Sequence, residues 1–330
     1  MADDFKYDGF LNHDSKDRSV TSPSFTNPQP LSLLTGHTSY VRGVALTSDA
    51  RRAVSCSADN TLRVWDLQTG GCLTTLQGHM SDVFSVALAS DDRRAVSGSR
   101  DKTLRVWNLR TGQCLTTLTG HTNVVRSVGL TSDNHRAVSS SDDTTLRVWD
   151  LKAGQCLAVL KGHTKAVRCV ALACEGKAVS ASDDKTLRVW DLQTRQCLTL
   201  LQGHTAPVWS VAVTSDARRA ISGAADKTLR VWDLQTGECI TTLKGHTSWV
   251  KSIAIALEDR IAVSGSRDKT VRLWDLQTGQ CLATLRGHTD SIWSVALTTD
   301  ARIALSGAAD STLRIWDLSP FLAENRHGSQ

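Results

Sequence analysis

The sequence lacks long apolar runs and the short motifs that mark common enzyme classes. No stretch reaches the roughly 18 consecutive apolar residues of a membrane-spanning helix. The N-terminus, MADDFKYDGF, is acidic and has no apolar core, so we expect no secretory signal. No glycine-rich phosphate loop, G-x-S-x-G or C-x-x-C occurs, so the usual sequence indications of nucleotide binding, acyl transfer and dithiol chemistry are missing. We expect a cytoplasmic protein.

Neither the nine cysteines nor the net charge of +5 favours a disulfide scaffold or a nucleic-acid-binding protein. Six cysteines recur at one position of a repeated unit: Cys72, Cys114, Cys156, Cys197, Cys239 and Cys281. Equivalent positions on successive units are expected to lie more than about 7 Å apart, too far for a disulfide, so we expect small buried hydrophobes in a reducing compartment. Seven arginines also recur, which favours a scaffold role over a nucleic-acid stripe: Arg63, Arg105, Arg147, Arg188, Arg230, Arg272 and Arg314.

A repeat of about 42 residues, read directly from the sequence, decides the fold class. Gly-His pairs begin at Gly36, Gly78, Gly120, Gly162, Gly203, Gly245 and Gly287. Trp-Asp pairs follow at the same period, and Trp107-Asn108 completes their series with one conservative departure. Within residues 79–120, four short runs (83–89, 93–99, 103–109 and 114–118) are separated by polar turns. Short runs with turns between them and no helical period predict an all-β protein.

With Gly-His and Trp-Asp in register seven times over residues 31–318, the chain resembles the WD40 family. The resemblance implies a seven-bladed β-propeller with four-stranded antiparallel blades. The segment PLSLL before the first Gly-His matches the fourth strand of the other units, and no fourth strand follows the last Trp-Asp. We therefore predict that residues 31–34 complete blade seven and close the ring. The predicted domains are an arm (1–30), the propeller (31–319) and a tail (320–330). The nearly identical units are similar to recently amplified propellers of bacteria, cyanobacteria among them.

Four complete residue series could suggest catalytic triads or metal sites, but the resemblance implies a structural hydrogen-bond tetrad in each blade. The histidines are His37, His79, His121, His163, His204, His246 and His288. The serines are Ser55, Ser97, Ser139, Ser180, Ser222, Ser264 and Ser306. The aspartates are Asp59, Asp101, Asp143, Asp184, Asp226, Asp268 and Asp310. The tryptophans are Trp65, Trp107, Trp149, Trp190, Trp232, Trp274 and Trp316. Since the histidines occur one per unit, we expect neither catalysis nor a metal or other cofactor.

The positions at which the units differ are freer of the packing demands of the repeat and can serve binding. Three columns vary: five residues after each tetrad His, three residues after it, and just before each tetrad Asp. The resemblance implies that these columns line the top face of the ring, around its central channel. Arginine and aromatic residues are the usual interface hot spots. The candidate partner-binding residues are Tyr40, Arg42, Phe84, Arg100, Arg126, Arg168, Trp209, Trp249, Lys251, Arg267 and Trp293, interpreted as a basic arc and an aromatic arc.

The first thirty residues do not match the repeat. Residues 4–17 resemble the opening strand and first box of TIR (Toll/interleukin-1 receptor) domains, with Asn12 in place of the usual Ser. The matching residues are Tyr7, Asp8, Phe10, Leu11, His13, Lys16 and Asp17. The rest of a TIR domain has no counterpart, so its NAD-cleaving activity is not implied. A remnant of a larger TIR–propeller protein, a short interaction tail and chance similarity stay open, and we expect a disordered arm.

These features predict a non-enzymatic scaffold or sensor, a monomeric ring that binds peptide or protein partners on its top face. One alternative is a degenerate subunit of a TIR–WD40 signalling or defence system, acting with an intact TIR NADase supplied by another protein. A less favoured alternative is nucleic-acid binding through the basic residues, which predicts steep salt dependence. The sequence does not name the partner.

Overall fold

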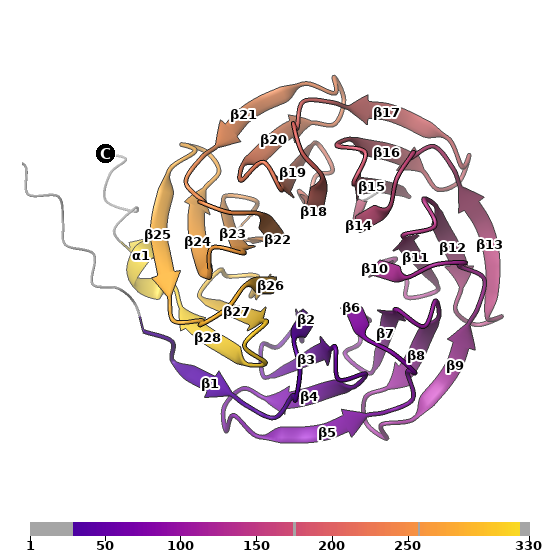
Figure 1. Cartoon of the computed structure of the whole chain (residues 1–330), viewed down its shortest axis with the longest axis horizontal. Coiled ribbons are helices and arrows are strands. Elements are labelled where there is room, and N and C mark those ends of the chain that lie inside the picture. Colours follow the sequence, from indigo (N-terminus) through magenta and orange to yellow (C-terminus); the bar gives the residue numbers. More distant parts are fainter. Residues whose placement is uncertain (1–28, 174–175, 257, 324–330) are drawn as a thin grey trace, which may run out of the picture.

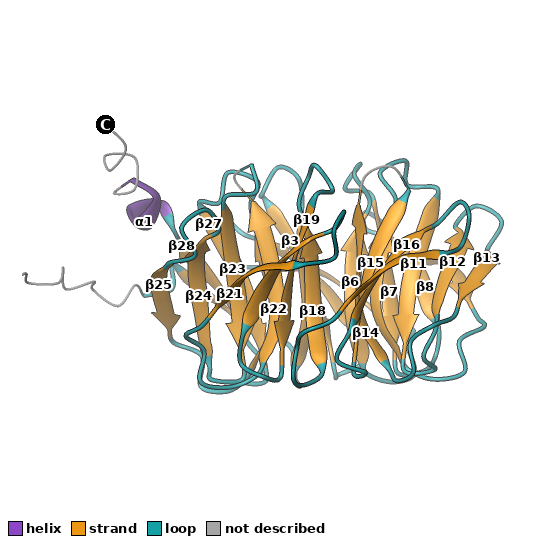
Figure 2. Cartoon of the chain, turned by 90° about the horizontal axis from the view of Figure 1, so that it is seen from above, coloured by secondary structure: helices purple, strands orange, loops and turns teal. Residues whose placement is uncertain are grey.

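Short runs rich in Val and Leu, each ended by a turn, fold into strands that pair with their sequence neighbours. A computed structural model describes residues 29–173, 176–256 and 258–323, and in these the strands form seven four-stranded antiparallel sheets, the blades, arranged as a ring (Figure 1). Seen edge-on, the strands span the thickness of the ring and loops cover both faces (Figure 2). This is the predicted seven-bladed propeller.

Each blade runs from an innermost strand to an outermost one. The innermost strands of blades one to seven are β2 (Val41–Leu46), β6 (Val83–Leu88), β10 (Val125–Leu130), β14 (Val167–Ala173), β18 (Val208–Val213), β22 (Val250–Ala256) and β26 (Ile292–Leu297). The second strands are β3 (Arg52–Ser57), β7 (Arg94–Ser99), β11 (Arg136–Ser141), β15 (Lys177–Ser182), β19 (Arg219–Ala224), β23 (Ile261–Ser266) and β27 (Ile303–Ala308). The third strands are β4 (Leu62–Asp66), β8 (Leu104–Asn108), β12 (Leu146–Asp150), β16 (Leu187–Asp191), β20 (Leu229–Asp233), β24 (Thr270–Asp275) and β28 (Leu313–Asp317).

The outermost strands show how the ring is closed. Six follow the third strand directly in sequence: β5 (Cys72–Leu76), β9 (Cys114–Leu118), β13 (Gln155–Leu160), β17 (Cys197–Leu201), β21 (Cys239–Leu243) and β25 (Cys281–Arg286). In blade seven this place is taken by β1 (Ser32–Leu34), which pairs antiparallel with β28 through Ser32↔Ile315 and Leu34↔Leu313. The predicted closure by residues 31–34 is confirmed.

The hydrophobic core is divided among the interfaces between neighbouring blades. In one cluster, Leu104 and Leu118 of blade two pack with Val125 and Trp149 of blade three. Equivalent clusters lie at the other interfaces. Because a blade buries its second face only against the next blade, the ring is stable as a whole and not blade by blade.

The repeated arginines pack against the Gly-His loops. Gly78 has a φ of +151°, and a Cβ atom there would lie 2.7 Å from Nη1 of Arg105. The same close approach of the arginine occurs at the Gly-His glycine of each blade. A larger residue there would have to displace the arginine, and the positive φ of Gly78 also favours glycine, so this packing places the seven arginines in the scaffold.

The structure differs from the sequence expectations at two places. The six repeated cysteines are not buried: Cys72 and Cys281 are exposed and the other four partly exposed, because they lie on the outermost strands, whose outer edge faces solvent. The eight cysteines among the described residues are unpaired. A short helix, α1 (Ser319–Ala323), also follows β28, and its Phe321 packs with Leu318 in the core. No helix in the described segments is long and apolar enough to cross a bilayer. Residues 4–17, the TIR-like segment, lie outside the described residues.

Candidate functional site

The tetrads are continuous hydrogen-bonded series of side chains. In blade one, the indole Nε1–H of Trp65 donates to Ser55 Oγ over 2.8 Å, and Ser55 Oγ lies 2.7 Å from Nε2 of His37. The other ring nitrogen, Nδ1, lies 2.7 Å from Asp59 Oδ2. The network is satisfied if Ser55 donates to Nε2 and Nδ1–H donates to the carboxylate, which corresponds to a neutral imidazole. The same three contacts recur in each blade within 2.7–2.8 Å.

The tetrad aspartates hold the turns that follow the second strands. Asp59 Oδ1 accepts hydrogen bonds from the backbone N–H and the hydroxyl of Thr61, and Oδ2 accepts from the N–H of Thr38. Burial alone would raise the pKa of Asp59, but the hydrogen bonds from His37, Thr61 and Thr38 outweigh it and hold the pKa well below its usual range. The carboxylate is therefore ionised at neutral pH and links the Gly-His loop to the turn.

The order Ser–His–Asp is that of a catalytic triad, but its surroundings are not. Ser55 is completely buried, and its oxygen already accepts the Trp65 indole N–H. A nucleophile must reach a substrate carbonyl, and a buried serine beneath a tryptophan cannot. This geometry supports the structural role. No group of three His, Cys, Asp or Glu residues suited to a metal ion occurs among the described residues.

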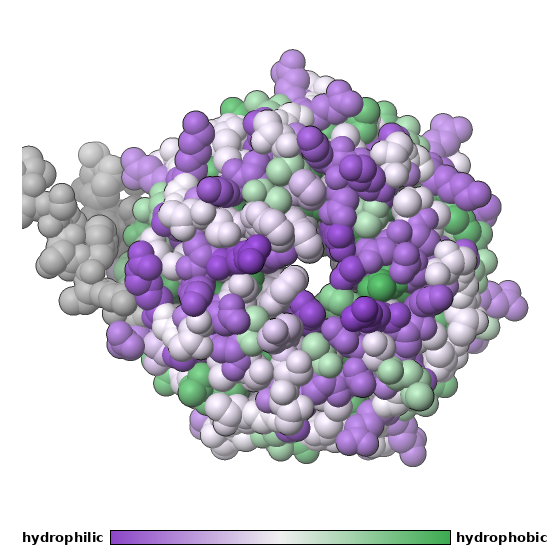
Figure 3. All heavy atoms as spheres, viewed as in Figure 1, coloured by the Kyte–Doolittle hydropathy of each residue, from purple (hydrophilic) through white to green (hydrophobic). Residues whose placement is uncertain are grey.

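Backbone hydrogen bonds bring the three variable columns together on one face. In blade two, the N–H of Arg100, just before the tetrad Asp, donates to the carbonyl of Asp82 over 2.8 Å. In blade six, the N–H of Arg267 donates to the carbonyl of Trp249 over 2.9 Å. The remaining column, five residues after each tetrad His, lies at the start of the innermost strands, next to these loops. We call this face the top face. Figure 3, viewed as Figure 1, shows hydrophilic side chains interspersed with less polar ones around a small central opening.

The seven residues five positions after the tetrad histidines form a belt around the axis. We call it the inner belt: Arg42, Phe84, Arg126, Arg168, Trp209, Lys251 and Trp293. The guanidinium carbon of Arg42 lies 4.3 Å from the ring centroid of Trp293 and 5.0 Å from that of Phe84. The guanidinium carbon of Arg126 lies 4.3 Å from the centroid of the same Phe84 ring, so this ring has an arginine on each side in the belt. These are cation–π distances, and from Trp293 through Arg42 and Phe84 to Arg126 the cationic and aromatic side chains alternate.

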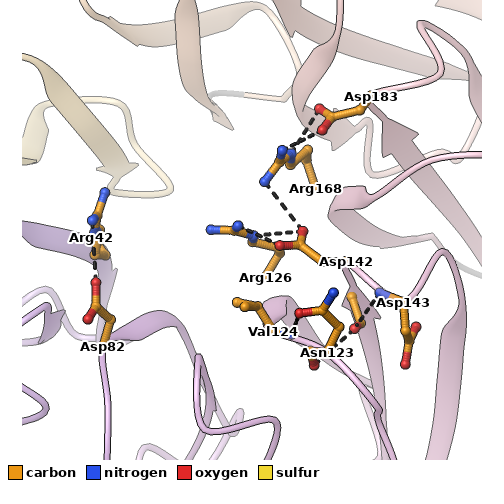
Figure 4. Close-up of polar contacts among 10 residues, drawn as sticks. Arg42, Asp82, Asn123, Val124, Arg126, Asp142, Asp143, Arg168 and Asp183 are labelled. Atoms are coloured by element: carbon orange, nitrogen blue, oxygen red, sulfur yellow. Dashed lines mark hydrogen bonds and ion pairs between the residues drawn. The ribbon is translucent and has the colours of Figure 1, made fainter.

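Aspartates join the arginines on one side of the belt (Figure 4). Asp142 accepts from Nε and Nη2 of Arg126 at 2.8 and 2.5 Å, and also from Nη1 of Arg168 at 3.3 Å. Arg168 forms a second, bidentate pair with Asp183. Arg42 contacts Asp82 of the next blade at 3.4 Å. The positive charge of the arginines on this side is therefore largely neutralised.

Tryptophans occupy the opposite side of the belt. The Arg168 guanidinium carbon lies 4.7 Å from the Trp209 centroid. Lys251 Nζ lies 3.1 Å from the Trp209 centroid and 4.5 Å from that of Trp293. Trp249, from the neighbouring column, stacks on Trp209 with centroids 5.8 Å apart. Because Trp293 contacts Arg42, the belt closes on itself.

The structure therefore brings the predicted binding residues together but not as two arcs. Cationic and aromatic side chains are interleaved, because neighbouring blades place column residues against each other. Tyr40 (44% exposed), Arg100 and Arg267 lie on the open rim, whereas Lys251 is buried at 7% exposure. Sequence reasoning omitted Asp82, Asp142 and Asp183 from the site. The sequence could have indicated two of them, because Asp142 and Asp183 come just before the tetrad Asp in the two blades that carry Arg126 and Arg168.

Seven segments match the family model described as WD domain, G-beta repeat: residues 28–66, 70–108, 112–150, 154–191, 195–233, 237–275 and 279–317. The chain belongs to the WD40 family. Together the matched segments cover most of the chain, and each joins one outermost strand to the three inner strands of the next blade. The predicted membership is confirmed.

Individual relatives match over short stretches. The chain is 39% identical over 61 residues to the cross-pathway control WD-repeat protein 2 of Flammulina velutipes, covering 17% of this chain and 19% of the relative. It is 37% identical over 75 residues to the small ribosomal subunit protein RACK1z of Oryza sativa subsp. japonica, covering 18% and 22%. It is 44% identical over 57 residues to the nuclear distribution protein PAC1 of Yarrowia lipolytica, covering 17% and 13%. The chain thus spans less than a quarter of the length of these relatives.

Proposed function

We propose that this protein is a non-enzymatic scaffold that holds a protein or peptide partner on the top face of its ring. The observation that carries the proposal is the inner belt. Seven blades with nearly identical tetrads differ where Arg42, Trp209 and Trp293 lie, and the differing side chains meet on one surface. Partly exposed aromatic and arginine side chains around a central opening are the composition of an interaction hot spot.

Two further observations support the proposal. Among the relatives named above, RACK1z is by its name a protein of the small ribosomal subunit and therefore part of an assembly. The Arg–Asp pairs argue against nucleic acid, because a phosphate backbone would have to displace Asp142 and Asp183 from their arginines. A protein partner can bind without displacing these aspartates, because it can contact the exposed aromatic and polar side chains beside them.

The test uses exposed arginines, so that the fold is preserved. We would introduce Arg100→Glu with Arg267→Glu on the top face, and Arg93→Glu with Arg302→Glu in exposed turns of the opposite face as a matched control. Affinity purification from the native cell, read out by mass spectrometry, should lose partners with the first pair and keep them with the control. Retention with the top-face pair and loss with the control would place binding elsewhere and overturn the proposal.

A further inference from the structure

Lys251 is an unusual residue for the centre of a binding face. It lies on β22 at 7% exposure and makes no hydrogen bond or ion pair with any described residue. Its Nζ atom is enclosed by three indole rings, with centroids at 3.1 Å (Trp209), 4.5 Å (Trp293) and 4.7 Å (Trp249). These are the three tryptophans outside the Trp-Asp series. We call these four residues the Lys251 box.

The Lys251 box contains hydrogen-bond donors without acceptors. The indole Nε1 atoms of Trp209 and Trp293 are buried and have no partner among the described residues. The tetrad tryptophans differ, because each donates to a serine. Nε of Arg42, beside Trp293, is likewise buried and unpartnered. Nε of each of the seven repeated arginines is also unpartnered within the described residues, but those occur one per blade, whereas here several such donors lie around one lysine. Since buried donors are normally satisfied, this grouping fits an acceptor that a ligand brings with it.

The charges around the Lys251 box point the same way. Arg42, Arg126 and Arg168 each have an aspartate partner, whereas Lys251 and Arg267 form no ion pair within the described residues. Burial is the main cause that lowers the pKa of Lys251 to about 6, and the positive charges of Arg168, Arg267 and Arg42 contribute, against an opposing effect of Asp183. Because Arg42 and Arg168 are paired with aspartates, the unpaired positive charge beside the tryptophans belongs to Arg267 and to the ammonium form of Lys251, and this charge attracts an anionic ligand and repels a cationic one.

We propose that the Lys251 box is a carboxylate-binding subsite that receives an acidic group of the partner. A carboxylate has only acceptor atoms, and these match Nζ of Lys251 and the two free indole N–H groups. The proposal rests on the proposed function and names the chemistry by which the top face recognises its partner. The carboxylate can come from an Asp or Glu side chain or from the C-terminus of a polypeptide.

Short synthetic peptides test the proposal with defined probes. We would titrate the purified full-length protein with acetyl-Ala-Phe-Glu-Phe-Ala-amide, with its Glu→Gln form, and with acetyl-Ala-Phe-Ala-Phe-Ala bearing a free C-terminus, using calorimetry. One ion pair with charged hydrogen bonds should make a carboxylate peptide bind at least roughly tenfold more tightly than the Gln peptide. The two carboxylate peptides distinguish a side chain from a C-terminus. Equal binding of all three, or tighter binding of the Gln peptide, would overturn the proposal.

A matched pair of variants assigns the effect to the lysine. Lys251→Met keeps the length and apolar stem but removes the charge, and it should abolish the preference for the carboxylate peptide. Lys244→Met, at an exposed lysine after β21, should leave the preference unchanged. Thermal melting of both variants verifies the fold. A carboxylate preference that survives in folded Lys251→Met would refute the role of the lysine.

The pH dependence of the wild-type protein needs no variant. A bound carboxylate favours the ammonium form, so the pKa of Lys251 rises on binding and the complex takes up a proton above about pH 6. The affinity for the Glu peptide should therefore fall as pH rises from 6 to 8, by up to about tenfold per pH unit. Calorimetry in buffers of different ionisation enthalpy should show proton uptake. No uptake and constant affinity would contradict the proposal.

The two proposals can fail separately. If the Arg100→Glu/Arg267→Glu variant loses partners but the carboxylate preference is absent, the carboxylate subsite is refuted and the scaffold function stands.

Discussion

The closure of the ring can be tested at a single side chain, Leu34 of β1. This leucine has no exposed surface and packs with Val41, Trp65 and Leu313 in one core cluster. Replacing a buried leucine with alanine removes its burial free energy and leaves a cavity, which together cost about 2–5 kcal/mol. Because β1 has only three residues, Leu34→Ala should weaken the clasp and lower the stability of the whole ring.

Leu33 provides a control on the same strand. It pairs with Arg314 in the same register, but its side chain points outward at 48% exposure. Leu33→Ala should therefore change the free energy of unfolding by no more than about 0.5 kcal/mol. Both variants keep the backbone pairing, so a difference between them isolates the buried side chain.

The assay is urea unfolding of both variants and the wild type, followed by circular dichroism and by tryptophan fluorescence. Leu34→Ala should shift the midpoint to clearly lower urea with both probes, and Leu33→Ala should not. If the two variants unfold at the same urea concentration as the wild type, β1 does not contribute to closure energetically and the reasoning is wrong. If the two probes give different midpoints, unfolding is not two-state, and the ring is less cooperative than its shared cores imply.

Three other predictions concern the clasp and the tetrads. Deleting residues 1–35 should lower the melting temperature strongly, whereas deleting 1–28 should not, and equal melting temperatures would contradict closure by β1. Ser139→Ala leaves the Trp149 indole and His121 without their shared partner and should cost about 1–3 kcal/mol in urea unfolding, against no measurable change for exposed Ser132→Ala. The tetrad aspartates have pKa values below that of an unfolded aspartate, so their stabilisation is complete above about pH 4 and is lost as pH falls further. The melting temperature should be nearly constant above pH 5 and fall progressively as the pH is lowered from 4 to 2, and a flat profile down to pH 2 would count against this linkage.

The repeat made the fold predictable, because the same pattern of strands and turns occurs seven times in the sequence. The run predicted at 114–118 is the strand β9, and the closing strand followed from a segment that matched the fourth strand of the other units. The helix α1 was not predicted, since no unit contains it. The prediction that the six repeated cysteines are buried was wrong. The sequence does not show which edge of an outermost strand faces solvent.

The binding face was predictable only as a list of positions. Comparing units shows where side chains differ, but which of them meet depends on how the blades face one another across the ring. The Asp142–Arg126 pair lies within one blade and could have been found by comparing columns. The contact of Arg42 with Asp82 joins two blades, and the enclosure of Lys251 by three tryptophans joins three. Such contacts need the geometry of the closed ring.

The split seventh blade has a consequence for how such a ring can grow. The unit that repeats in the sequence joins an outermost strand to the three inner strands of the following blade, so it is one strand out of phase with the unit that folds as a sheet. Duplication or loss of one whole unit would therefore leave the pairing of β1 with β28 unchanged. The pairing of β1 with the last third strand therefore does not depend on the number of units between them. The count of seven must then be set by the angle at which neighbouring blades pack, in clusters such as that of Val125 and Trp149.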